Sequence, residues 1–340
     1  MSFWRWLSWR VAGFVPMMVL VSIIVFGMVR LLPGNPAYRL AGLGASAETI
    51  KQIETELGLN KPLPVQYWQY IGRVARGDLG HSSYTHQPVS AELAQRLPAT
   101  VELLTVSFVI AVVLGVSIGV FLAVVRRGRT AQLTEKVFNI YGLLAGAIPE
   151  FWLGLILIYI FFFKLNWLPG PIGRVDLYVG RPEHVTGLYL VDSILTGDWS
   201  GFRSVVAHLV LPVATLAFLV MAPVIRMTRA SVLQALDSEF VRHARRCGLH
   251  ESMVARYALR AALAPIVTVI ALLYSYLLGG AVLVEKVFAW GGLGQYAVQA
   301  VVVSDYAPLQ AFVLLAAIVS LVTFLVVDVL YALIDPRVRL

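Results

Sequence analysis

Three arginines and a leucine recur at three- and four-residue spacing in one short polar stretch of this sequence. Arg242, Arg245, Arg246 and Leu249 would share one face of a short helix, and Gly248 can supply the left-handed turn that ends it. A cationic helix of this kind can dock in a groove of another protein. Charge alone also allows another interpretation, in which these arginines only fix the orientation of a membrane protein.

A second candidate is Glu150, which directly follows Pro149 inside an apolar run. An ionisable side chain in a membrane span costs at least ~3 kcal/mol if it faces lipid, so it usually faces a cavity or a partner. Glu150 could line a transport pathway and attract a cationic end of the cargo, with Pro149 opening the local backbone. It could equally be a carboxyl group locked against a neighbouring helix.

The elements that must position these residues are long apolar helices. The chain has 340 residues, of which 59% are hydrophobic and 14% are charged, whereas soluble domains have about 25% charged residues. Runs near the roughly 20 residues that cross a bilayer predict an all-α integral membrane protein with about six spans. The predicted spans are 11–31, 99–125, 137–163, 205–225, 262–285 and 309–333.

The net charge of +8 is sorted by segment, which argues for membrane orientation rather than nucleic-acid binding. More than half of the 27 Lys and Arg residues fall in the termini and in two short connections, and the remainder are spread over the longer segments 32–98, 164–204 and 286–308. The positive-inside rule then places both termini in the cytoplasm. In the first long external segment, Ser46 is the expected N-cap of a helix near 47–57.

Several kinds of site are missing from the sequence. Cys247 is the only cysteine, so an internal disulfide or a cysteine zinc site is excluded. No Gly-Lys pair occurs, which excludes a P-loop, and HExxH is absent. His81 and His86 form only a loose pair without a third metal ligand. We therefore expect no enzyme activity, no metal and no cofactor in this chain.

Two pairs of glycines suit close packing of helices. Gly115 and Gly119 form one GxxxG pattern and Gly142 and Gly146 form another, each inside a predicted span. The pattern is also common by chance in apolar helices, so it predicts these contacts only weakly.

Residues 239–249 resemble the conserved cytoplasmic loop of binding-protein-dependent ABC importer permeases. Arg242-His243-Ala244 stands where many members have Glu-Ala-Ala, and Gly248 follows after three residues. The departure at the first two positions is familiar in the peptide-transporter branch, which the chain resembles from end to end. Further motifs of that branch keep their order: LPGNP (32–36), LGLNKPLP (57–64), GDLG (77–80), RLPATVEL (96–103), HLVLP (208–212), RMTRAS (226–231), VFAWGGLG (287–294) and DPRVR (335–339).

The resemblance implies a type I ABC importer permease fold, most similar to the first permease of dipeptide and oligopeptide importers. It implies a first helix plus external segment (1–98) and a five-helix core (99–340) with a coupling loop at 226–260. The partners would be a second homologous permease, two ATPase domains that hold ATP and Mg, an extracytoplasmic solute-binding protein and the lipid of a bacterial inner membrane. The implied ATPase-coupling residues are Phe240, Val241, Arg242, His243, Ala244, Arg245, Arg246, Gly248 and Leu249.

Other interpretations remain open on the sequence. Nickel-chelate and glutathione importers share these motifs, so the cargo is undecided. A secondary transporter would show inverted repeats or interrupted helices with midplane charges. Only Glu150 with Pro149 fits that description, and the Arg-rich segment would stay unexplained.

Overall fold

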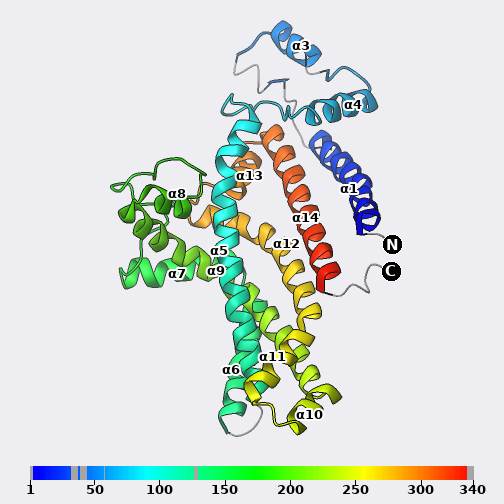
Figure 1. Cartoon of the computed structure of the whole chain (residues 1–340). Helices are drawn as coiled ribbons and strands as arrows, with labels where there is room; N and C mark the ends of the chain where they lie inside the picture. Colours follow the sequence, from blue (N-terminus) through cyan, green and yellow to red (C-terminus); the bar gives the residue numbers. More distant parts are fainter. Residues whose placement is uncertain (1–2, 32–36, 39–43, 57, 126–128, 335–340) are drawn as a thin grey trace. The chain divides into compact units, whose positions relative to one another are not determined.

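The protein folds almost entirely into helices (Figure 1), and this computed structural model describes residues 3–31, 37–38, 44–56, 58–125 and 129–334. The motifs expected at 32–36 and 335–339, the first residue of that at 57–64, and Arg126 and Arg127 lie outside the described residues. The long helices are α1 (Phe3–Leu31), α5 (Val89–Val124), α6 (Arg129–Ala147), α9 (Trp199–Leu236), α12 (Leu263–Val287) and α14 (Tyr306–Ile334).

Shorter helices connect them. They are α3 (Ala47–Glu56), α4 (Leu63–Val74), α7 (Glu150–Leu157), the π-helix η1 (Ile158–Lys164), α8 (Tyr189–Thr196), α10 (Glu239–Arg246), α11 (Glu251–Ala261) and α13 (Leu293–Val302). The helix predicted near 47–57 is confirmed as α3, and the Ser46 hydroxyl accepts a hydrogen bond from the backbone N–H of Thr49 at 3.1 Å.

Five described helices are long and apolar enough to cross a membrane, and a bent pair brings the number to six if it counts as one span. The prediction of an all-α membrane protein with about six spans is therefore confirmed. The structure extends two of them well beyond the apolar runs, because α5 has 36 residues and α9 has 38. Asp198 caps the start of α9 by accepting the backbone N–H of Gly201 at 2.9 Å.

The predicted third span, 137–163, is not one helix. α6 ends at Ala147 and α7 begins at Glu150, with an angle of 109° between the two halves. Pro149 lies at the break in an extended conformation with φ −64° and ψ 139°. Proline has no N–H to continue the helical ladder and disfavours helical geometry in the residue before it, which explains the break. Glu150 accordingly begins a new helix rather than lying at the centre of a continuous one.

The chain divides into two compact units that differ from the predicted domains. Among the described residues, unit 1 comprises those in 99–291 and 322–334, and unit 2 comprises those in 3–98 and 292–321. The helices α5 and α14 each contribute one part to each unit. The sequence-based boundary at 98/99 stays a prediction, since these units are defined by contacts alone.

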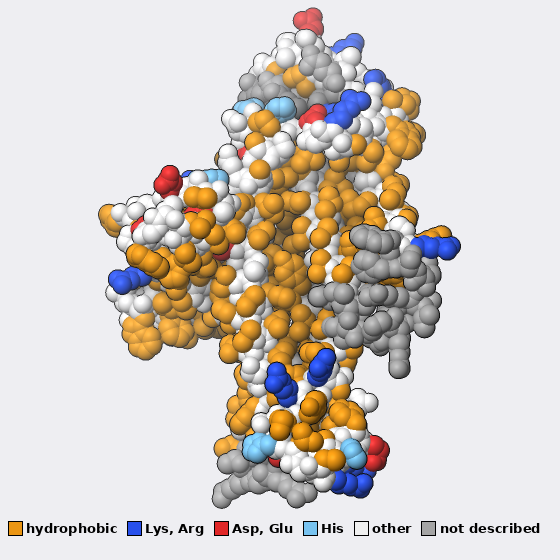
Figure 2. Space-filling model, in the orientation of Figure 1, with side chains coloured by type: hydrophobic (Ala, Val, Ile, Leu, Met, Phe, Trp, Pro, Cys, Tyr) orange, Lys and Arg blue, Asp and Glu red, His pale blue; other side chains and the backbone are white. Residues whose placement is uncertain are grey.

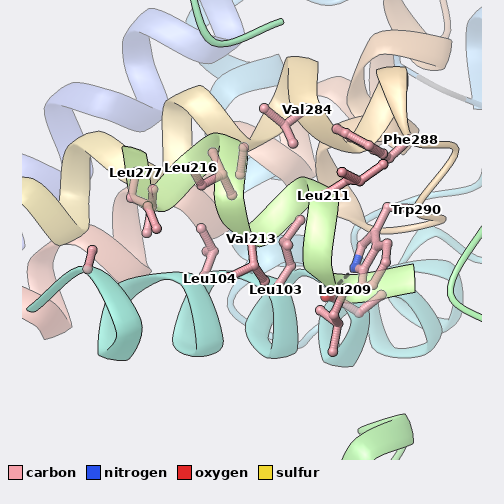
Figure 3. Packing of buried hydrophobic residues seen from close by; sticks show 14 of the residues in the cluster. Leu103, Leu104, Leu209, Leu211, Val213, Leu216, Leu277, Val284, Phe288 and Trp290 are labelled. Carbon is pink, nitrogen blue, oxygen red and sulfur yellow. Dashed lines mark hydrogen bonds between the residues drawn. The ribbon is translucent and has the colours of Figure 1, made fainter. Parts of the chain in front are cut away.

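The core of unit 1 is a cluster of apolar side chains from α5, α9 and α12 (Figure 3). Leu103 and Leu104 face Leu216, and Trp290 donates its indole N–H to the Ala99 carbonyl at 2.9 Å. In a membrane, such side chains stabilise the contact between helices chiefly by van der Waals packing. The indole hydrogen bond satisfies the one polar atom among them.

Glycine lets α5 approach α9 closely. A Cβ built on Gly115 would lie 2.7 Å from Val224 Cγ1, and one on Gly119 would lie 2.6 Å from Thr228 Cβ. No residue larger than glycine fits at either position without displacing α9, so the first GxxxG prediction is confirmed. Gly146 has no heavy atom within 4 Å of such a Cβ, so the second pattern makes no comparable contact within the described residues.

Unit 2 has two smaller cores. One joins Leu79 and the first turns of α5 to α13 and α14, through Val89, Tyr296 and Ala311. The other places Phe26 of α1 against Tyr70 of α4. Burial raises the pKa of the Tyr70 phenol to about 12, with the nearby Tyr67 adding to the rise and Arg73 opposing it. Tyr67 and Tyr70 therefore pack against Phe26 of α1.

Much of the visible surface is apolar. Figure 2 shows hydrophobic side chains along extended stretches of helix. Exposed examples include Leu143 and Val137 on α6 and Ile24 on α1. Surfaces of this size mark contact with lipid or with another protein, which is consistent with a chain that spans a membrane.

Candidate functional site

The cationic stretch at 239–249, here called the coupling segment, forms α10 and its C-terminal turn. Gly248 has φ +77°, and its backbone N–H bonds to the Arg245 carbonyl at 3.0 Å. The N–H of Leu249 reaches back to the Ala244 carbonyl at 3.2 Å. This pair of bonds is a Schellman motif, which requires a left-handed residue and so favours glycine. The predicted short helix and its glycine-dependent end are confirmed.

One side chain anchors α10 to the rest of unit 1. Val241 is fully buried and belongs to an apolar cluster with Val232 and Leu236 of α9 and Val254 and Ala258 of α11. Of the nine expected coupling residues, Val241 therefore faces the chain's own core rather than a partner. Its role in this structure is to hold α10 in place.

Shortening Val241 to alanine is expected to loosen α10 without unfolding the protein. Two buried methyl groups are lost at about 0.8 kcal/mol each, so local opening of α10 should become easier by roughly 2 kcal/mol. Hydrogen exchange of the amides in the coupling segment measures this opening. Exchange rates in α10 equal to those of the unchanged protein would contradict the anchoring role, and Phe240→Ala is the control because Phe240 is 48% exposed.

The rest of α10 is largely exposed and charged. Phe240, Arg242, His243, Arg245 and Arg246 are all exposed. The phenyl ring of Phe240 beside several cationic side chains is a composition that suits docking in a groove of another protein. Ala244 and Leu249 are half-buried at the edges of this surface.

Two intramolecular ion pairs organise the exposed arginines. The Arg242 guanidinium donates to Glu239 at 2.9 Å, and Arg245 donates to both carboxylate oxygens of Glu251 at 2.9 and 3.1 Å. The bond from Arg245 lowers the pKa of the Glu251 carboxyl. Because the pair links α10 to α11, it fixes the angle at which the coupling segment is presented. Among the described residues, Arg246 has no carboxylate partner.

Glu150 lies in the first turn of α7 and faces α12. Its Oε1 is 3.2 Å from where a Cβ on Gly280 would stand, so this glycine leaves the space that the carboxylate occupies. The side chain is half-buried, and no hydrogen bond to it is found among the described residues. The helix N-terminus favours a negative charge at this position. Pro149 and Glu150 thus lie at the break between α6 and α7, and the coupling segment belongs to a different helix, α10.

A groove of about 430 Å³ lies between α5, α6 and α9. Its lining is mostly apolar, with Phe138 and Tyr141 on α6, and it carries Arg226 and Arg229 on α9. Arg229 pairs with Glu135 at 2.8 Å. The sequence analysis placed these two arginines in the RMTRAS motif and in the implied coupling loop, but nothing in the sequence shows that α6 and α9 enclose a groove. The arrangement can hold an elongated group that ends in an anion.

The loop between η1 and α8 is tied to α5 by a buried ion pair that the sequence analysis did not single out. The Arg174 guanidinium donates to Glu102 at 2.6 Å and lies 3.5 Å from the centre of the Tyr189 ring. The other carboxylate oxygen of Glu102 accepts the backbone N–H of Leu190 at 2.7 Å. The pair has side-chain exposures of 9% and 3%. The available signal was an acidic residue inside an apolar run, the same signal that drew attention to Glu150.

A second acidic residue, Asp192, holds the backbone of the segment that precedes α8. Burial opposes ionisation of Asp192, but hydrogen bonds from the Thr186 hydroxyl and backbone and from the Gly187 N–H outweigh it and lower the Asp192 pKa.

The described residues contain no group of three His, Cys, Asp or Glu side chains placed to hold a metal ion. His81 and His86 are both exposed.

Comparison with known proteins gives the family. Residues 89–340 match the family model described as binding-protein-dependent transport system inner membrane component, and residues 3–104 match the model of the N-terminal part of such membrane components.

Similar proteins span the whole chain. A probable D,D-dipeptide transport system permease protein, DdpB, of Escherichia coli K12 is 39% identical over 99% of this chain and 98% of its own length. The dipeptide transport system permease protein DppB of Alkalihalophilus pseudofirmus is 36% identical over 97% and 98%. The glutathione transport system permease protein GsiC of Pectobacterium atrosepticum is 37% identical over 97% of each. The apolar helices, the coupling segment and these matches together show that the chain belongs to the family of inner membrane components of binding-protein-dependent transport systems.

Proposed function

We propose that this chain is the first of two permease subunits in an ATP-driven importer of dipeptides or oligopeptides. The observation that carries the proposal is the similarity, over nearly the full length, to permeases named for dipeptide transport. The chain contributes the pathway and the coupling segment, and hydrolysis of ATP with Mg takes place on partner ATPase subunits. Both termini and the coupling segment lie on the cytoplasmic side, since the Lys and Arg residues gather there.

The exposed face of α10 supports the proposed mechanism. Phe240 and the arginines around it suit a groove on an ATPase subunit, while Val241 and the Arg245–Glu251 pair transmit movement of α10 to α9 and α11. Closure of the ATPase dimer then shifts the helices between two states of access, and the loaded binding protein biases the same equilibrium from outside. Because α10 ends in a fixed turn at Gly248, it is suited to pass movement of the ATPase subunits on to α9 and α11.

Glutathione is the second candidate cargo, because GsiC is about as similar to this chain as the dipeptide permeases are. Both cargo classes are small peptides with a free amino group and a carboxylate. Selection between them belongs mainly to the external binding protein. Competition between labelled dipeptide and glutathione for uptake by the assembled transporter would separate the two.

Co-purification tests the proposed function. The tagged chain is isolated from its native membrane in mild detergent, and its partners are identified by mass spectrometry. A second permease of the same family and ATPase subunits are expected. Recovery of the chain alone or as a homo-oligomer, together with solute movement in vesicles without ATP, would replace the importer with a secondary transporter.

Replacing Glu150 with glutamine is expected to slow peptide import several-fold without affecting assembly. Glutamine keeps the size of the side chain beside Gly280 and removes the negative charge that would attract the cationic end of a peptide. The initial rate and KM of uptake by reconstituted transporter measure the effect, with Glu183→Gln on an exposed external position as control. A rate and KM equal to those of the unchanged transporter would leave Glu150 a structural residue.

A further inference from the structure

A small polar cavity in unit 2 has no role in the coupling mechanism. Its volume is about 130 Å³, and its walls come from the loop before α5, the first turns of α5, α13 and the start of α14. The polar side chains that line it include Ser82, Tyr84, Arg96, Gln299 and Asp305. By the proposed topology, these segments are external.

The carboxylate of Asp305 has one satisfied oxygen and one free oxygen. Oδ2 accepts the Ser82 hydroxyl at 2.5 Å and the Tyr84 backbone N–H at 3.2 Å. Oδ1 is buried and has no hydrogen-bond partner among the described residues, although Asp305 is only 2% exposed. A buried carboxylate oxygen without a donor is costly, so such an atom normally has one.

The local backbone lacks one of the usual donors for that oxygen. Asp305 directly precedes α14, where an acidic side chain usually accepts an N–H of the first helical turn. The third residue of that turn is Pro308, which has no N–H. Asp305 is also held firmly, because its own N–H bonds to the Ala300 carbonyl at 2.7 Å. Oδ1 is therefore fixed in position.

The other charges around the cavity are already matched. The Arg96 guanidinium lies 4.7 Å from the centre of the Tyr296 ring and 4.0 Å from Glu92 Oε1. The Tyr296 hydroxyl donates to the other oxygen of Glu92 at 2.5 Å. Arg96 and Glu92 offset each other, which leaves the negative charge of Asp305 uncompensated. A cation that donates hydrogen bonds is the complementary ligand.

Size narrows the ligand further. A volume of about 130 Å³ exceeds the ~30 Å³ share of one water molecule several-fold. It is well below the ~300 Å³ at which pockets for whole small molecules begin. The head of one lysine or arginine side chain matches this volume, and a complete peptide does not.

We propose that the Asp305 cavity receives a lysine or arginine side chain of the external solute-binding protein and anchors that protein on the permease. The inference rests on the proposed function, since it needs an external partner. A buried charge pair at the centre of a docking surface is a recurrent anchor, and it acts chiefly on the lifetime of the complex.

The test uses the complete transporter reconstituted in vesicles. The affinity of peptide-loaded binding protein is read from its stimulation of ATP hydrolysis, and basal hydrolysis is recorded without it. Asp305→Asn removes the charge with little change of shape, and Gln299→Phe fills the cavity while keeping the charge. Glu183→Gln removes an exposed external charge elsewhere and serves as control.

Both cavity variants are expected to weaken binding-protein affinity by about tenfold or more, with basal hydrolysis unchanged and the control within about twofold of the unchanged transporter. One Lys or Arg substitution on the binding protein should then cause no further loss in combination with Asp305→Asn. If the transporter with Asp305→Asn does not assemble, the affinity measured with Gln299→Phe alone tests the proposal.

Three results would overturn the inference. Affinity within about twofold in both cavity variants would do so while leaving the importer intact. Unchanged affinity with a raised KM for peptide would assign the cavity to the cargo instead. A wild-type complex that no binding protein stimulates would remove the proposed function together with this site.

Discussion

Replacing Gly248 with valine is expected to lower ATP-dependent import by about tenfold or more. Gly248 has φ +77°, a conformation that costs an L-residue roughly 1–2 kcal/mol and a β-branched residue more. Relaxation of that strain breaks the two bonds that end α10, so the exposed face is no longer held at its angle to α11. Initial uptake rates of reconstituted transporter measure the effect.

Gly248→Asn is the matched variant, because asparagine tolerates the left-handed region far better than valine. It is expected to keep most of the import rate. Gly72→Ala, in the last turn of α4 with no heavy atom within 4 Å of the added Cβ, controls for loss of a glycine as such. Equal rates for the valine and asparagine variants would show that the left-handed turn does not matter for coupling.

Replacing Glu102 with alanine is expected to destabilise unit 1 by about 3–5 kcal/mol, because it leaves the Arg174 guanidinium buried without its counter-charge. The Leu190 backbone N–H loses its acceptor in the same change. Thermal unfolding of the purified complex measures the loss, and import should fall because the external loop is no longer fixed to α5.

The double variant Glu102→Met with Arg174→Met separates charge from packing. Two apolar side chains leave no buried charge unpaired, so this variant is expected to be more stable than Glu102→Ala. Glu183→Gln on the same external segment controls for a surface charge. A Glu102→Ala protein within about 0.5 kcal/mol of the unchanged one would contradict the role given to the pair.

Local patterns predicted local structure well. Ser46 capped α3 and Gly248 ended α10 as expected, since capping and left-handed turns depend on a few neighbouring residues. Gly115 and Gly119 also packed as expected. The family followed from motif order, and 36–39% identity to relatives confirmed it.

Tertiary relationships could not be read in the same way. Hydropathy averages over a window, so it placed 137–163 in one span. Pro149 predicted a local opening of the backbone there, but not the sharp bend between two separate helices. Val241 was grouped with its exposed neighbours because only contacts with α9 and α11 reveal that it is buried. Partnerships such as Glu102 with Arg174 join residues far apart in sequence, and no spacing rule predicts them.

The coupling of import to ATP tests the account most directly. The assembled complex is reconstituted in vesicles with peptide-loaded binding protein outside, and labelled dipeptide uptake is compared with ATP or ADP inside. Uptake that requires ATP and is lost in the Gly248→Val variant is the predicted result. Uptake at the same rate with ADP would contradict it and show that the chain moves solute without an ATPase.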